Sequence, residues 1–110
     1  MYGGTGADIM RGGNDDDDMN GEDGNDSMSG NAGDDTMNGG LDNDILCGQA
    51  HTAGIGDVLY DGDVAAGVDT LWGNGSADDT CNSGNASTLL DNGCFLVGPG
   101  TRTGTAPTCP

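Results

Sequence analysis

The large apolar residues in the first half of the chain recur every nine residues. Glycine and polar residues fill the intervals between them. This period fits neither the 3.6 residues of a helix nor the two residues of a long strand. Each large apolar residue is instead typical of the inward middle residue of a strand only three residues long. The pattern predicts many short strands separated by turns, with this inward row: Met10, Met19, Met28, Met37 and Leu46.

On that period, residues 3–47 divide into five blocks: GGTGADIMR, GGNDDDDMN, GEDGNDSMS, GNAGDDTMN and GGLDNDILC. Glycine opens every block, Asp stands sixth, and the large apolar residue stands eighth. The first six positions are rich in Gly, Asn and Asp, which favour turns because they tolerate positive φ or hydrogen-bond the local backbone. Two blocks then close one coil of a solenoid that has two facing sheets. Successive blocks alternate between the sheets.

After Gly48 the nine-residue spacing breaks, although an Asp followed two residues later by an apolar residue or Cys returns three times. We interpret these places as three further strands with inserted loops, and we expect one more strand at Thr88–Leu90. The run Cys94–Val97 is the most hydrophobic and is expected to cap the open end, and the tail after it is expected to be loop.

The predicted fold class is therefore an all-β parallel β-roll that forms a single domain over residues 1–110. Its expected parts are regular repeats at 3–47, irregular repeats at 48–92, and a C-terminal cap and tail at 93–110.

Composition sharpens the functional reading. Hydrophobic residues make up 33% of the chain, aromatic residues 4%, and Gly occupies 23 of the 110 positions. Nineteen acidic groups against two basic ones give a formal net charge of −17. Such a chain repels nucleic acid, because both are polyanions. Nothing in it predicts an apolar pocket that would tune a carboxylate for catalysis, so we expect no enzymatic activity. No stretch is long enough to span a membrane.

The sixth-position aspartates are candidate metal ligands. Blocks eighteen residues apart should lie one strand spacing apart, about 4.8 Å, on the same edge of the solenoid. Two unpaired carboxylates at that distance repel by about 1–3 kcal/mol, and a Ca²⁺ ion between them reverses the sign. Calcium accepts 6–8 oxygen ligands, which turn carbonyls can complete. We expect several Ca²⁺ ions, held by these residues: Asp8, Asp17, Asp26, Asp35, Asp44, Asp57, Asp69 and Asp79.

The five blocks resemble the RTX (repeats-in-toxin) nonapeptide GGxGxDxUx, in which U is large and apolar. The resemblance covers Gly3 to Cys47. The departures are Asp15 and Asp42 in place of the fourth-position Gly, and Glu22 and Asn31 in place of the second. The resemblance implies a calcium-loaded parallel β-roll and a secreted protein that folds on meeting extracellular calcium.

Four cysteines and the absence of lysine suggest an oxidising compartment. None of the cysteines forms a CxxC pair, and two disulfides are expected, with three possible pairings. We place these bridges near the irregular C-terminal end, where a terminal coil lacks a neighbour to complete its sheets.

The sequence favours a secreted, structural calcium-binding module. Two alternatives remain open: a segment of an extracellular fibre or adhesin that assembles end to end, and the non-catalytic C-terminal repeat region of a secreted toxin or hydrolase. The N-terminal coil carries no capping element, so we expect further repeats of a parent chain or a second copy to dock there.

Overall fold

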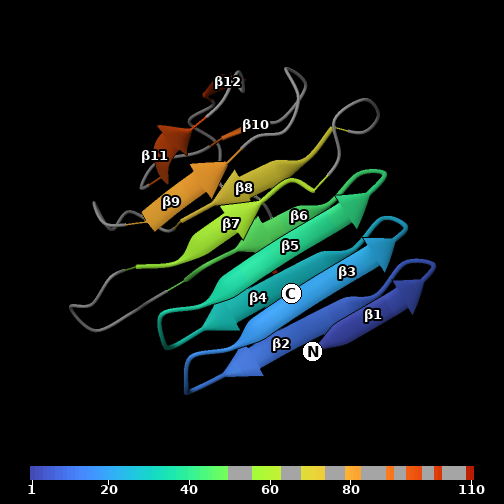
Figure 1. The fold of residues 1–110 in the computed structure, drawn as a ribbon, viewed down its shortest axis with the longest axis horizontal. Helices are drawn as coiled ribbons and strands as arrows, with labels where there is room; N and C mark the ends of the chain where they lie inside the picture. The colour runs from blue at the N-terminus through green and yellow to red at the C-terminus, as the bar shows by residue number, and fades with distance from the viewer. Residues whose placement is uncertain are drawn as a thin grey trace.

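A computed structural model describes residues 1–49, 56–62, 68–73, 79–82, 89–90, 94–97, 101–102 and 109–110. All regular structure within them is β-strand, arranged as two sheets of six parallel strands each. The chain alternates between the sheets, so that every odd-numbered strand lies in one sheet and every even-numbered strand in the other. Figure 1 shows the two layers one behind the other, with short turns linking them at both edges.

The first sheet contains, in spatial order, β1 (Tyr2–Thr5), β3 (Asp18–Asp23), β5 (Thr36–Leu41), β7 (Val58–Tyr60), β9 (Asp79–Asn82) and β11 (Cys94–Val97). The second contains β2 (Ile9–Gly13), β4 (Ser27–Asn31), β6 (Ile45–Cys47), β8 (Thr70–Trp72), β10 (Leu89–Leu90) and β12 (Thr101–Arg102). The predicted parallel β-roll, a form of β-solenoid, is confirmed.

The pairing register follows the repeat. Met10 pairs with Met28, and Met19 pairs with Met37. The later coils keep the register although inserted residues lengthen them, since Met37 pairs with Leu59 and Leu46 pairs with Leu71. The inserted residues therefore lie in the turns, where extra chain does not disturb the ladder of strands.

A thin core runs along the axis between the two sheets. It consists of the inward residue of each strand, and every member is at most 5% exposed: Met10, Met19, Met28, Met37, Leu46, Leu59, Leu71 and Cys81. Because each short strand turns only one side chain inward, the core is a single stack from each sheet. Methionine suits such a narrow space, since its flexible side chain fills irregular gaps.

One expectation for the C-terminal part needs correction. The tail is not loop throughout, because Thr101–Arg102 forms β12 and pairs with β10. The run Cys94–Val97, expected to cap the open end, forms β11, which pairs with β9 and is the last strand of the first sheet. The same physical reason places both strands. The open edge of a short parallel strand offers unpaired backbone groups, and a following segment of chain satisfies them.

The turns keep their backbone conformation even where glycine is replaced. Glu22 and Asn31 adopt φ of 77° and 75° at the second position, and Asp42 adopts 79° at the fourth. Gly48 opens the next turn, and Gln49 at the second position of that turn has φ of 73°. The turn geometry therefore extends two residues past the last regular block. The left-handed conformation costs a non-glycine residue about 1–2 kcal/mol, which the surrounding ladder must offset. Only Asp15 departs, since its φ is not positive.

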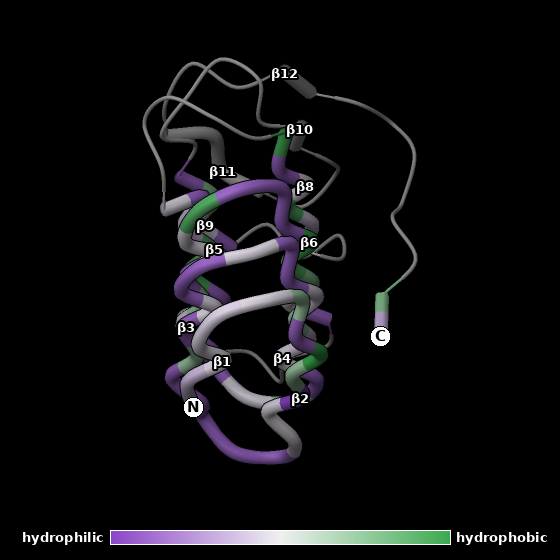
Figure 2. The backbone as a smooth tube through the Cα atoms, turned by 90° about the vertical axis from the view of Figure 1, so that its right-hand side faces the viewer, coloured by the Kyte–Doolittle hydropathy of each residue, from purple (hydrophilic) through white to green (hydrophobic). Residues whose placement is uncertain are grey.

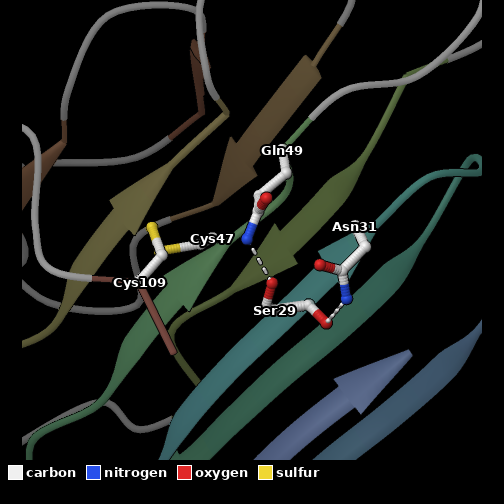
Figure 3. The surroundings of a disulfide bond; sticks show 5 residues. All are labelled: Ser29, Asn31, Cys47, Gln49 and Cys109. Carbon is white, nitrogen blue, oxygen red and sulfur yellow. Dashed lines mark hydrogen bonds between the residues drawn. A yellow bond between two sulfur atoms is a disulfide. The ribbon is translucent and has the colours of Figure 1, made fainter. Parts of the chain in front are cut away.

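A disulfide joins Cys47 of β6 to Cys109 in the tail, across a sequence separation of 62 residues. Figure 3 shows this bridge near a polar group on the same sheet, in which the Gln49 amide donates to the Ser29 hydroxyl. The expected disulfide near the C-terminus is confirmed. It holds the C-terminal tail to strand β6, which lies inside its sheet between β4 and β8. Figure 2 shows the C-terminus beside the solenoid, well away from the β10–β12 end. Cys81 is also disulfide-bonded.

Candidate metal sites

The eight predicted aspartates form two continuous rows, one on each edge of the solenoid. Within each row, the backbone N–H of one Asp donates to Oδ1 of the Asp in the next coil, at 2.8–2.9 Å. The first row is Asp8, Asp26, Asp44 and Asp69, and the second is Asp17, Asp35, Asp57 and Asp79. The expected placement of the aspartates on two edges is confirmed, and the irregular coils join the same rows.

The second carboxylate oxygen of these residues points into the protein. Oδ2 of Asp8, Asp26 and Asp35 is buried and has no hydrogen-bond partner. A buried carboxylate oxygen without a partner is costly, because it has lost its water and gained nothing in return. The arrangement calls for a positive group next to each of these oxygens.

The glycine that opens each block makes room beside that oxygen. A Cβ placed on Gly21 would lie 2.2 Å from Oδ2 of Asp26 and 2.3 Å from the carbonyl oxygen of Gly39 in the next coil. Gly3 and Gly12 face the same combination of a carboxylate oxygen and a carbonyl oxygen. A carboxylate from one coil and a carbonyl from the next therefore border one small hollow, which any larger residue at the first position would fill.

Burial dominates the electrostatics of the rows. Desolvation raises the pKa of Asp26 and of Asp35, although the backbone N–H that each accepts acts in the opposite direction. Desolvation also raises the pKa of Asp69 to about 7, against the N–H of Asp44 and with help from the charge of Asp61. The sequence holds only two basic side chains, and one of them, Arg11, is exposed. The protein thus supplies little positive charge of its own to these rows.

Comparison with known families identifies the repeat. Residues 1–28 and 11–46 match the family model of the RTX calcium-binding nonapeptide repeat, which spans four copies of the motif. The two matches together cover residues 1–46, which contain the regular nonapeptide blocks. Comparison with curated proteins and with solved structures found no significant match. The RTX match ends near Leu46, so the assignment of the later coils to the same roll comes from the strand register and the aspartate rows.

The geometry of these RTX turns fits calcium. The donors are all oxygen, as calcium prefers, and they come from adjacent coils. Among the described residues, no three Asp, Glu, His or Cys side chains converge closely enough to hold an ion by themselves. Backbone carbonyls such as that of Gly39 must therefore complete the ligand set. A bound Ca²⁺ would supply the positive charge that the buried Oδ2 atoms lack, while the aspartates hold adjacent coils in register.

Some residues of the site escaped the sequence analysis. Gly48 and Gly73 occupy the first position of two irregular turns. A Cβ on Gly48 would lie 2.1 Å from Oδ2 of Asp57, and a Cβ on Gly73 would lie 2.5 Å from Oδ2 of Asp79. Both glycines directly follow the last residue of a strand, and this position in the sequence could have identified them. Asp61 was also missed. It follows β7 at the first position, where the regular blocks have Gly, and it is fully buried.

A second, shallower ladder runs beside the first row. Oδ1 of Asn25 accepts the N–H of Asn43 at 2.9 Å, and Oδ1 of Asn43 accepts the N–H of Val68 at 2.7 Å. Here the later coil donates to the earlier one, which is the reverse of the aspartate rows. On the other edge Asp16 accepts from Asp34 in the same sense. These fifth-position side chains close the turns against each other, so Asp16 has a structural role of its own.

We predict that Asp26→Asn lowers the number of calcium ions bound at saturation by at least one. Asn keeps an oxygen for the Asp8 N–H but loses the negative charge that calcium requires. The matched control is Asp18→Asn, because Asp18 is an exposed acid on β3 outside both rows. Isothermal calorimetry and native mass spectrometry measure the stoichiometry. Equal calcium counts in the two variants would contradict the assignment of the rows as ligands.

Acid should stabilise the metal-free roll. Burial raises the pKa values of Asp26, Asp35 and Asp69 above the ordinary 3.8, so at these three residues the folded state holds protons that the unfolded state releases. Their contribution to stability is full below pH 3.8 and is lost as the pH rises through the folded values, about 7 for Asp69. In EDTA, strand content by circular dichroism should increase as the pH falls from about 8 to about 5. In limiting calcium the trend should reverse, because protons compete with calcium for the carboxylates. Loss of strand signal on acidification in EDTA would refute this.

Proposed function

We propose that this protein is an extracellular, structural RTX β-roll module whose folding is driven by Ca²⁺ bound between stacked turns. The observation that carries the proposal is the two rows of aspartates, in which Oδ2 of Asp8 and of Asp26 is buried beside a turn carbonyl and has no hydrogen-bond partner. The proposed ligands are the eight row residues, and several ions would bind along the two edges.

The energetics support calcium-driven folding. The core is one residue wide, and the formal net charge is −17. Ordering the backbone costs about 1–2 kcal/mol of conformational entropy per residue, and burial of so narrow a core offsets only part of that cost. Buried like charges add to that cost. When ligands assemble only in the folded chain, the free energy of metal binding appears as free energy of folding.

The cellular setting follows from the family and the cysteines. RTX repeat proteins are typically secreted, and the Cys47–Cys109 bridge suits an oxidising environment. In the chain-entropy model, closing a loop of 62 residues stabilises the fold by about 4 kcal/mol. RTX repeats are generally structural rather than catalytic, which favours a non-enzymatic role here. The part of the chain that the structure describes contains no helix long and apolar enough to cross a membrane.

Calcium should convert the chain from a largely unfolded state to the roll. Titration of the EDTA-treated protein with Ca²⁺, followed by circular dichroism, should show a cooperative gain of strand signal. Mg²⁺ is the control and should be much less effective, because it demands tight octahedral geometry and releases water reluctantly. A full strand spectrum in EDTA at neutral pH would overturn calcium-driven folding.

Exposed apolar residues favour end-to-end assembly as a second candidate function. Tyr2 on β1 is 75% exposed, and Ile9 on β2 is 69% exposed. These are the first strands of the two sheets. Within the described residues, no strand pairs with the outer edge of either. An additional parallel coil would pair with the open edges of β1 and β2, would border both apolar residues, and would bring N–H donors to Oδ1 of Asp8 and Asp17, continuing the two rows. We propose a second copy of this chain, docked head to tail, as the occupant, since contacts of that kind repeat without closing.

Tyr2→Glu/Ile9→Glu should abolish this association. Sedimentation velocity in saturating calcium should show concentration-dependent oligomers for the natural chain and monomers for the double variant, because buried charge at a strand edge opposes pairing. Leu41→Glu is the control, since Leu41 is 52% exposed at the end of β5, a strand that lies between β3 and β7 and not at the edge of its sheet. A natural chain that remains monomeric at high concentration rules out self-docking, and leaves the edge to preceding repeats of a longer chain.

A further inference from the structure

One turn departs from the rule that glycine opens the block. Asp61 follows β7 directly and stands in the column that Gly21 and Gly39 occupy in the earlier coils of the same edge. Its carbonyl accepts the N–H of Gly40 at 3.2 Å, and its own N–H donates to Asn82 at 3.1 Å, so its backbone belongs to the ladder. The roll therefore places Asp61 at the position where the earlier coils of this edge have Gly, and its side chain is fully buried.

The spacing between the first-position residue and the row Asp also changes at this turn. In the regular blocks, a Cβ at the first position would lie 2.0–3.0 Å from Oδ2 of the row Asp. The row Asp of the Asp61 turn is Asp69, eight residues later rather than five as in Gly21 to Asp26. The close spacing that excludes a side chain in the regular blocks is therefore not repeated in the sequence of this turn.

The result is a pair of fully buried carboxylates in one turn. Asp61 and Asp69 both have no exposed surface, and their side chains lie within hydrogen-bonding range of each other. Oδ1 of Asp69 accepts the N–H of Asp44, while its Oδ2 is buried with no hydrogen-bond partner. This oxygen faces a second carboxylate instead of a glycine. Two adjacent buried carboxylates are stable together only with a shared proton or a bound cation.

The repeat would supply this rung with two row carboxylates, Asp44 and Asp69, one from each coil. Asp61 adds a carboxylate beside Asp69, at a position where the RTX motif has Gly. Calcium sites gain affinity as the count of charged oxygen ligands rises. The additional carboxylate also lies on the buried side of the turn, where water competes least.

We propose that Asp61 is a calcium ligand specific to this chain, and that the site it forms with Asp69, next to Asp44, is the tightest of the array. The inference rests on the proposed calcium-binding function. It assigns a role to a residue outside the nonapeptide pattern, and it makes the first irregular coil, rather than the regular repeats, the place where calcium binding begins.

Terbium luminescence can report on this site selectively. Tb³⁺ binds hard oxygen ligands as Ca²⁺ does, and it emits when a nearby aromatic ring is excited. Tyr60 directly precedes Asp61, and Trp72 follows Asp69 by three residues, so an ion here lies close to two aromatic donors. In Asp61→Asn, the terbium concentration at half-maximal sensitised emission should rise by about tenfold or more, because one charged ligand is lost. Native mass spectrometry at limiting calcium should show a smaller population of the species with one Ca²⁺ bound in this variant than in the natural chain.

Asp18→Asn is the matched control, since it removes one exposed acid elsewhere and should overlay the natural chain. Asp61→Gly restores the residue that the repeat uses at this position, and it should shift the titration in the same direction. It also keeps the test valid if the Asn variant does not fold at saturating calcium.

The competing possibility is a proton shared between Asp61 and Asp69 with no ion. In that case Asp61→Asn and Asp61→Gly would stabilise the metal-free protein and leave the terbium midpoint and the calcium count unchanged, which would overturn the proposal. A natural chain that takes up no calcium at all would instead overturn the proposed function. The two failures are therefore distinguishable.

Discussion

Everything in this structure depends on the stacking of buried carboxylates at a fixed spacing. The Asp of each coil receives an N–H from the preceding coil through Oδ1 and turns Oδ2 inward. The first contact fixes the distance between coils, and the second creates a need for positive charge that the chain itself does not supply. Strand pairing, the glycine positions and the narrow core follow from this spacing. In a solenoid built in this way, the buried negative charges oppose folding unless a cation neutralises them, which is the basis of the calcium-binding function proposed above.

The roles of glycine and methionine also follow from the row of aspartates. Glycine is required at the first position mainly because the carboxylate of the same block lies against its α-carbon, as Asp26 does against Gly21. Methionine at the eighth position is the only large side chain that each short strand turns inward. The division of labour within nine residues thus places ligands on the edges and apolar groups on the axis. A shift of one residue along a strand would turn the apolar residue outward and a polar neighbour into the core.

The irregular half shows how the roll tolerates variation. Insertions fall between the first-position residue and the row Asp, as between Gly48 and Asp57, and the strands on either side keep their register. These turns also depart from the repeat in their residues, since Asp61 stands where the regular blocks have Gly. The disulfide from Cys47 to Cys109 ties this variable half back to the regular coils and restrains it independently of calcium.

The sequence by itself determined the period, the solenoid, the two edges and the identity of the row aspartates, because these are local consequences of one short repeat. Asp8, Asp26 and Asp44 could be assigned to one edge by counting, since eighteen residues make one coil. The tertiary structure alone decided the pairing of Cys47 with Cys109, the addition of β12 to β10, and the approach of Asp61 to Asp69. Each of these depends on where a chain segment of irregular length returns to the stack. Irregular spacing carries no periodic signal, and only the packing of one coil on the next specifies that return.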